Sequence, residues 1–343
     1  MHSHRHLNLL RAGLASLAFL LLVPGCASRE GSRRLSEPVY RVWPEAPMEP
    51  RIAFGQAFRD PKEAGLRWTG SSWLSRLLLG EPQGTLVRPF GLALDESNNL
   101  CIADSGNAMV SFLDFSRKSW ESWRKIGPIE FAAPVAVAKR ADTLYVADSG
   151  LAQVLAFNLK GKLLFQISDG LQRPSGLAIS QDKLFVVDSA AHKIFAFDLA
   201  GTPLFTFGSR GTGPGEFNFP THLAADSDGR LFVTDSMNFR VQIFDSQGHW
   251  QKAFGQVGDG SGSLTRPKGL AVDRQGSIFV VDALFDNVQI FNEAGDFLLA
   301  FGERGNGPGQ FWLPAGIAVA ADQIFVADAY NRRIQVFNLL PLP

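Results

Sequence analysis

Six aspartates recur at nearly constant intervals and are the first candidates for chemistry in this sequence. They are Asp104, Asp148, Asp188, Asp235, Asp282 and Asp328. A ring of carboxylates could hold a divalent cation. The same residue at the same place in every repeat is better explained as a turn device, because a carboxylate at a strand end accepts hydrogen bonds from nearby backbone N–H groups. We therefore predict that these aspartates shape turns and bind no metal.

The two cysteines, Cys26 and Cys101, suggest neither a disulfide framework nor a metal cluster. Cys101 lies in the apolar run LCIAD, so we expect a buried, inert thiol. Cys26 follows residues 1–25, whose basic start and short apolar stretch are typical of a signal peptide. The run LLVPGCAS resembles the lipobox of bacterial lipoproteins, in which the cysteine carries the lipid anchor. An ordinary cleaved secretion signal, with Cys26 incidental, is the alternative.

The lipobox resemblance implies a cellular address. The mature chain would begin at Cys26 and be held in the bacterial cell envelope by acyl chains, of which each buried methylene contributes about 0.8 kcal/mol. Ala27 is not the aspartate that often retains such lipoproteins at the inner membrane. The outer membrane is therefore the expected destination, on either its periplasmic or its outer side. Residues 26–49 are polar and rich in proline, which predicts a tether.

The overall composition bounds the fold and excludes one class of partner. The 343 residues are 45% hydrophobic, enough for a large core. The chain has 33 Lys and Arg against 33 Asp and Glu, so its formal net charge is zero. Because nucleic-acid binding generally uses a broad basic surface, we expect no nucleic-acid partner.

A repeat of 40–47 residues organises most of the chain. A proline opens each of six units, namely Pro89, Pro134, Pro174, Pro220, Pro267 and Pro314. One of the six aspartates follows each proline by 14 or 15 residues. Such a period is typical of propeller blades or of a helical solenoid.

Short apolar runs decide between these two folds. GLALD, LFVTD and RVQIFD are typical of three successive strands, and WQKAFG of a fourth, which makes each unit a propeller blade. The last unit has no fourth strand, but RIAFG at 51–55 matches the fourth strands of the others. We therefore predict an all-β, six-bladed propeller of four-stranded antiparallel blades over residues 50–340. The N-terminal strand would complete the last blade and close the ring, which leaves no open sheet edge.

An insertion separates this closing strand from the first repeat. Residues 59–88 include about 22 more residues than the other links, by the repeat spacing. Within it, Trp73, Leu74, Leu77 and Leu78 fall on one face of a predicted helix. That helix would pack on the propeller or contact a partner or membrane surface.

The links GSRGTGPGEFNFP and GERGNGPGQFWLP resemble those of the NHL-repeat family of six-bladed propellers. The resemblance covers residues 50–338 and implies the fold, which is compatible with many activities. The peptidylglycine-amidating lyases are similar in fold and place zinc-binding histidines directly after the repeat proline, where this sequence has none. Lactonase-like propellers hold a divalent cation on the axis with carboxylates and amides. The starts of the innermost strands here lack carboxylates.

The residues after the repeat prolines and the loops after the aspartates should surround one mouth of the channel. The candidate binding residues there are Phe90, Ser175, Thr221, His222, Lys268, Arg240, Arg332 and Arg333. Variable loops on one rigid face are how a scaffold diversifies binding. We expect a monomeric, non-catalytic binding or assembly module, without metal or cofactor, for a protein, peptide or glycan. The alternative is a hydrolase or lyase with a divalent cation at the channel mouth.

Overall fold

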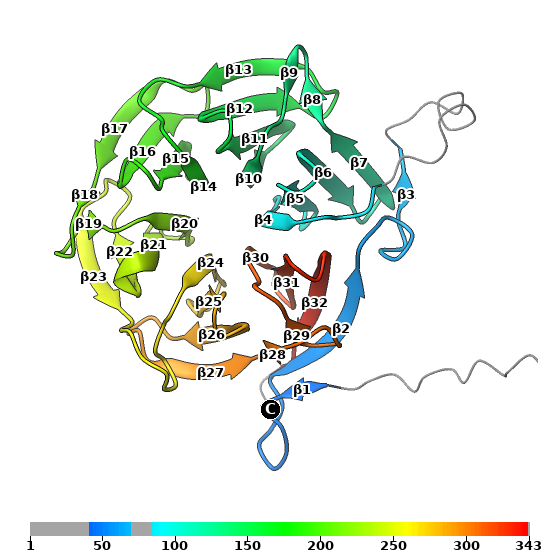
Figure 1. Cartoon of the computed structure of the whole chain (residues 1–343), viewed down its shortest axis with the longest axis vertical. Helices are drawn as coiled ribbons and strands as arrows, with labels where there is room; N and C mark the ends of the chain where they lie inside the picture. Colours follow the sequence, from blue (N-terminus) through cyan, green and yellow to red (C-terminus); the bar gives the residue numbers. More distant parts are fainter. Residues whose placement is uncertain (1–40, 70–83, 342–343) are drawn as a thin grey trace, which may run out of the picture. The chain divides into compact units, whose positions relative to one another are not determined.

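The computed structural model describes residues 41–69 and 84–341, which form a ring of β-sheets around a central axis (Figure 1). Six antiparallel sheets surround the axis, so the prediction of an all-β, six-bladed propeller is confirmed. The predicted signal peptide (1–25), Cys26 and the helix expected around Trp73 and Leu77 lie outside the described residues. No helix in the described part of the chain is long and apolar enough to cross a membrane.

Blades 1 to 5 follow the chain from the axis outwards (Figure 1). Blade 1 has β4 (Pro89–Leu94), β5 (Leu100–Asp104), β6 (Met109–Asp114) and β7 (Ser119–Trp123). Blade 2 has β10 (Pro134–Arg140), β11 (Thr143–Asp148), β12 (Gln153–Asn158) and β13 (Leu163–Ile167). Blade 3 has β14 (Pro174–Ser180), β15 (Lys183–Asp188), β16 (Lys193–Asp198) and β17 (Pro203–Phe207). Blade 4 has β20 (Pro220–Ala225), β21 (Leu231–Asp235), β22 (Arg240–Phe244) and β23 (Trp250–Phe254). Blade 5 has β24 (Pro267–Val272), β25 (Ile278–Asp282), β26 (Asn287–Phe291) and β27 (Phe297–Phe301).

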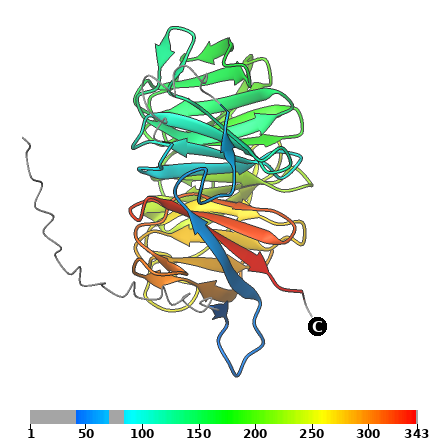
Figure 2. The same cartoon turned by 90° about the vertical axis from the view of Figure 1, so that its right-hand side faces the viewer.

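Blade 6 is built from both ends of the described chain. Its inner strands are β30 (Ile317–Val319), β31 (Gln323–Asp328) and β32 (Arg333–Leu339), and its fourth strand is β2 (Ile52–Phe58). β2 pairs antiparallel with β32, and Figure 2 shows the two strands side by side. This confirms the prediction that the RIAFG stretch supplies the missing strand.

The ordered sheet begins before residue 50, within the segment predicted as a tether. Strand β1 (Val42–Trp43) pairs antiparallel with β2 and extends blade 6 to five strands. Trp43 packs on the apolar core of the blade, with its ring centroid 5.7 Å from that of Phe337. Burial of this aromatic ring against blade 6 explains why a proline-rich stretch is held in the sheet.

Shorter strands connect or extend the blades. β3 (Arg67–Trp68) adds in parallel to β7, so blade 1 also has five strands. β8 (Lys125–Ile126) and β9 (Ile129–Glu130) form a hairpin between blades 1 and 2. The Gly-rich links contain two parallel pairs, β18 (Ser209–Arg210) with β19 (Glu216–Phe217) and β28 (Glu303–Arg304) with β29 (Gln310–Phe311). The 3-10 turn η1 (Ser236–Asn238) follows β21.

Burial explains why the strands differ in sequence pattern. The second strand of each blade is packed between two neighbouring blades, so β21 and β25 are buried at every position and read as continuous apolar runs. In the Gly-rich links, Phe217 and Phe311 are fully buried. Gly208 precedes one of these phenylalanines with φ +91°, and a Cβ there would lie 2.5 Å from the Phe217 ring, so the link needs glycine.

Candidate functional site

The six strand-end aspartates define one face of the propeller, which we call the Asp face. All six side chains are fully buried. Asp104, for example, accepts hydrogen bonds from the backbone N–H groups of Val87 and Arg88, each at 2.8 Å, and of Gly106 at 3.0 Å. Each aspartate thereby ties the link before its repeat proline to the loop after its own strand. The prediction that these residues shape turns is confirmed.

Two predicted binding residues, Arg240 and Arg333, belong to this turn framework. Arg333 is 6% exposed, and its Nε donates to Asp328 at 2.7 Å. The rest of its guanidinium donates to backbone carbonyls of the Gly-rich link, including that of Gly307 at 2.7 Å. Arg240 repeats the arrangement in blade 4, with Nε 2.9 Å from Asp235. These guanidinium groups hold the links in place and are not free for a partner, whereas neighbouring Arg332 is exposed.

Three other predicted residues come together at the channel mouth, the axial opening of the Asp face. Phe90 of blade 1 stacks on His222 of blade 4, with ring centroids 5.7 Å apart and ring planes at 20°. The ammonium of Lys268, from blade 5, lies 5.3 Å from the centre of the Phe90 ring. Ser175 and Thr221 serve the framework, because their hydroxyls bond the Pro220 carbonyl and Thr234 respectively.

The polar groups at the channel mouth lack partners. His222 is 9% exposed, and neither of its ring nitrogens has a hydrogen-bond partner among the described residues. Burial, helped by the charge of Lys268, lowers the pKa of His222 to about 3, so the ring is neutral near pH 7. Burial and the charge of Arg266 lower the pKa of Lys268 to about 8. Among the described residues no carboxylate pairs with the Lys268 ammonium.

His222 occupies a position that is otherwise reserved for very small residues. Two places after the repeat proline, the other blades have Gly91, Ala136, Gly176, Gly269 and Gly316. There the innermost strands nearly touch, since a Cβ on Gly316 would lie 2.1 Å from the Phe90 carbonyl oxygen. Only blade 4 places a ring at this position. The repeat register in the sequence carries this signal, although His222 was predicted only as a residue of the channel mouth.

The channel narrows below the mouth and widens toward the opposite face. A cavity of about 30 Å³ touches His222 and the innermost strands of the other blades. A wider cavity of about 350 Å³ opens at the far end and contains the ion pair between Asp95 and Lys139, at 3.0 Å. Burial raises the pKa of Asp95, but hydrogen bonds from Lys139 and Asn99 outweigh it and hold the pKa below its usual value. The polar groups at the far end are therefore paired, unlike those at the mouth.

Exposed apolar side chains lie on the Asp face at blades 1, 4, 5 and 6. They lie in the links before the repeat prolines and in the loops after the aspartates: Val87, Phe219, Met237, Leu284, Trp312 and Tyr330. We call them the apolar rim. Trp312 and Tyr330 contact each other at 5.5 Å between centroids, and Arg88 lies 5.8 Å over Tyr330. On the far side of the mouth, Arg173 lies 5.7 Å from the centre of the Phe219 ring. These loops were predicted from the sequence as part of the binding face, but these residues were not.

Comparison with known proteins supports this architecture. Residues 168–230, 222–284 and 272–341 match the DUF5128 family, described as a 6-bladed beta-propeller. These stretches together span half of the chain. The protein belongs to this family. A search of curated proteins found no significant sequence match.

Solved structures share the fold of this 6-bladed propeller at low sequence identity. A catalytically inactive virginiamycin B lyase from Staphylococcus aureus, in complex with quinupristin, is 12% identical with a TM-score of 0.55, over 74% of this chain and 95% of that one. A gluconolactonase from Xanthomonas campestris is 17% identical with a TM-score of 0.57, over 74% and 87%. An auxiliary nutrient binding protein from Bacteroides thetaiotaomicron is 15% identical with a TM-score of 0.56, over 74% and 69%. At such identities the likeness extends to the fold alone.

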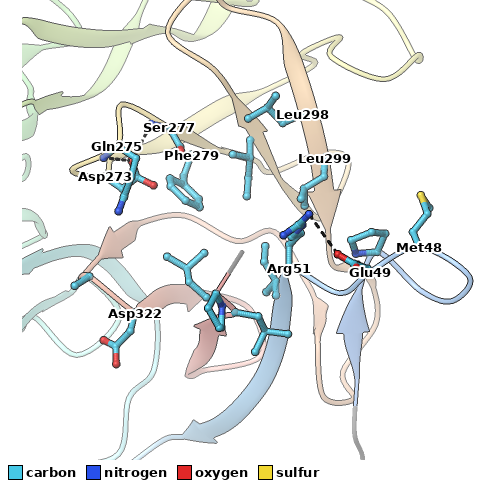
Figure 3. Close-up of a pocket in the computed structure, with 17 residues that line it drawn as sticks. Met48, Glu49, Arg51, Asp273, Gln275, Ser277, Phe279, Leu298, Leu299 and Asp322 are labelled. Atoms are coloured by element: carbon cyan, nitrogen blue, oxygen red, sulfur yellow. Dashed lines mark hydrogen bonds and ion pairs between the residues drawn. The ribbon is translucent and has the colours of Figure 1, made fainter. Parts of the chain in front are cut away.

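The propeller has a second hollow, away from the Asp face, at the junction of blades 5 and 6. This cavity of about 930 Å³ is lined by Ile52 of β2, by Phe279 and Leu299 of blade 5, and by the chain around Leu340 (Figure 3). Its walls are largely apolar. Two of the polar groups at its edge are engaged, since Arg51 pairs with Glu49 at 3.7 Å and Asp273 accepts backbone N–H groups of its own turn. No residue predicted from the sequence as a binding residue lies in it.

In residues 41–69 and 84–341, no group of three or more His, Cys, Asp or Glu side chains could hold a metal ion. His192, one of the histidines there, is engaged with the backbone carbonyl of Phe217 at 3.1 Å.

Proposed function

We propose that this protein is a non-catalytic binding or assembly module that presents its Asp face to a protein, peptide or glycan of the bacterial cell envelope. The observation that carries this proposal is the apolar rim. Six of the twelve large apolar side chains exposed in the described residues lie on this one face. Aromatic residues, Met and Arg are the types enriched in protein interfaces, and this face combines all three.

The rigidity of the scaffold favours binding over catalysis. Every blade is packed between two neighbours, and the aspartate networks fix the loops on the Asp face. A preorganised surface loses little conformational entropy when a partner docks, so more of the contact energy remains as affinity. The gluconolactonase and the lyases among the structural neighbours leave a hydrolase or lyase as the alternative. A divalent cation for that alternative would need other donors, because the described residues hold no cluster of three His, Cys, Asp or Glu side chains.

A matched pair of tryptophans tests the docking surface. Trp312 is in the apolar rim and is 46% exposed, whereas Trp250 is on the outer strand of blade 4 and is 41% exposed. We expect Trp312→Ala combined with Tyr330→Ala to reduce cross-linking to the envelope partner about tenfold, as expected for the loss of interface hot spots. Trp250→Ala should leave the cross-linking unchanged. Equal losses in both variants, or no loss in the first, would contradict the proposal.

We further propose that acyl chains on Cys26 anchor the protein in the envelope, with the outer membrane as its destination. The support is the sequence alone, in the LLVPGCAS run after an apolar leader. A Cys26→Ser variant should lose incorporation of labelled fatty acid and move from the membrane fraction to the soluble fraction. The melting temperature of its propeller should not change. Unaltered labelling in this variant would refute the anchor without affecting the proposal for the Asp face.

A further inference from the structure

At the channel mouth, the buried His222 ring and the half-buried Lys268 ammonium have no hydrogen-bond or ion-pair partner among the described residues, and the same kind of ligand would satisfy both. We infer that the channel mouth is a binding site for a compact oxyanion, a carboxylate or a phosphate group, received between Lys268 and His222. The inference rests on the proposed function, since the anion would be a group of the partner that docks on the Asp face. It adds to that proposal the chemical class of the group that binds at the channel mouth.

Lys268 has no counter-ion among the described residues. Its ammonium lies against the face of the Phe90 ring, and no carboxylate pairs with it in the described residues. The charged group that acts on it is Arg266, which has the same sign. An ammonium withdrawn from water without an opposite charge is unfavourable, and a cation–π contact offsets only part of that penalty. An anion at the channel mouth would remove the rest of this penalty.

His222 supplies a hydrogen-bond donor at the same place. A neutral imidazole carries one N–H donor, and here neither nitrogen is engaged with any described residue. The contrast with His192 is informative. His192 is also buried, but its Nδ1 contacts the Phe217 carbonyl and the Phe219 backbone N–H, so it has a structural role. His222 has no such role and stands where the other blades have glycine or alanine.

Phe90 covers the imidazole and is the group that must move. Its ring stacks on His222 on one side and faces the Lys268 ammonium, and the side chain is only partly buried. Rotation of a partly exposed side chain is fast compared with partner binding. The cavity below His222 holds only about 30 Å³, so a ligand chain has no room to thread through the axis.

The pH dependence of anion binding follows from the titration of Lys268. An anion favours the protonated form of Lys268 and so raises its pKa from about 8 when bound. Affinity should therefore be highest below pH 8 and fall as the pH rises through that value.

Histidine NMR on the purified full-length protein tests the site with two probes, acetate and inorganic phosphate. With ¹³Cε1-labelled histidine at pH 7 and constant ionic strength, the His222 resonance should shift saturably with at least one probe, in the millimolar range expected for so small a ligand. His192 and His249 serve as internal controls and should not follow that saturation curve. The probe that binds more tightly distinguishes a carboxylate site from a phosphate site.

Three variants complete the test. Lys268→Met should weaken the binding about tenfold, as expected for the loss of a charge-assisted contact. Phe90→Ala should bind the anion at least as tightly as the parent protein does. Lys160→Met changes an exposed lysine elsewhere on the propeller and should bind the anion as tightly as the parent protein. No saturable shift of His222 with either probe, as for a cavity that holds only water, would overturn the inference. An equal affinity in Lys268→Met would overturn it as well.

The two proposals fail in distinguishable ways. If neither anion binds but Trp312→Ala with Tyr330→Ala still loses the partner, the Asp face remains the docking surface and the anion site is wrong. If acetate or phosphate binds as described but the rim variants keep the partner, the anion site stands and the docking surface is elsewhere.

Discussion

The strand-end networks and the channel mouth handle buried polar groups in opposite ways, although they lie on the same face. In blade 4, Asp235 is fully buried and accepts hydrogen bonds from the backbone of Asn218, from Arg240 and from Gln242. At the channel mouth, His222 is buried and Lys268 is half-buried, and neither side chain has a hydrogen-bond or ion-pair partner among the described residues. The strand-end networks therefore satisfy their polar side chains from within the fold, whereas we assign His222 and Lys268 to a ligand.

The largest expected effect comes from breaking the network in blade 6. Asp328→Ala would leave Arg333 buried and unpaired and remove the acceptor for Trp312 N–H, at 2.9 Å. Loss of one member of a buried ion pair destabilises a protein by about 3–5 kcal/mol. Urea unfolding of the variant should show that loss. Asp182→Ala, at a side chain 96% exposed, is the control and should change the stability by less than about 0.5 kcal/mol.

Arg332 and Arg333 allow a networked arginine and an exposed arginine to be compared at adjacent positions. Arg333→Ala should destabilise the propeller by about 2–4 kcal/mol, because Asp328 and three backbone carbonyls lose a donor. Arg332→Ala, at an exposed position, should stay within about 0.5 kcal/mol. Denaturant unfolding of the pair checks both values. Similar losses for the two residues would mean that the network contributes less than its geometry implies.

His222 should destabilise the fold in acid. Its pKa in the folded state is about 3, below its usual value of 6.5, so between these values the unfolded chain takes up a proton that the folded chain refuses. Stability therefore falls as the pH decreases through this window, by about 2 kcal/mol from pH 6.5 to pH 5. In His222→Phe this contribution to the slope should be absent. Equal slopes in the two proteins, measured by unfolding at several pH values, would contradict the burial of an unpaired ring.

The smallest expected effect is a gain in stability, whereas the first two variants are expected to lose stability. Lys268→Met should stabilise the ligand-free protein by about 1–2 kcal/mol at pH 7, because folding no longer withdraws a charge from water. The folded-state pKa of Lys268 is about 8 against 10.5 in the unfolded chain, so the gain should shrink as the pH rises between these values. Thermal melts at pH 7 and pH 10 give the comparison. A loss of stability at pH 7 would indicate a counter-ion within the chain.

The sequence alone was sufficient to predict the architecture, because each repeat contains local patterns that indicate its strands and turns. The proline-to-aspartate spacing located every blade, and RIAFG at 51–55 revealed the closing strand because it repeats the fourth-strand motif. The turn function of the aspartates followed from the same regularity. Only short-range chemistry is needed for either inference.

The site was only partly accessible from sequence because it is assembled across blades. Phe90, His222 and Lys268 come from blades 1, 4 and 5, and no local pattern shows that they meet. Arg333 carries the same charge as its neighbour Arg332, yet one is buried and the other exposed. Likewise Phe311 is fully buried beside exposed Trp312, so residue type alone did not reveal the apolar rim.

The most direct test of the central claim is a measurement of the Lys268 and His222 side-chain pKa values by NMR in ligand-free protein. If both side chains are withdrawn from water without partners, the pKa of Lys268 should be about 8 and that of His222 about 3. Values near the ordinary 10.5 and 6.5 would show that both groups are solvated or paired, and the channel mouth would then have no need of an anion.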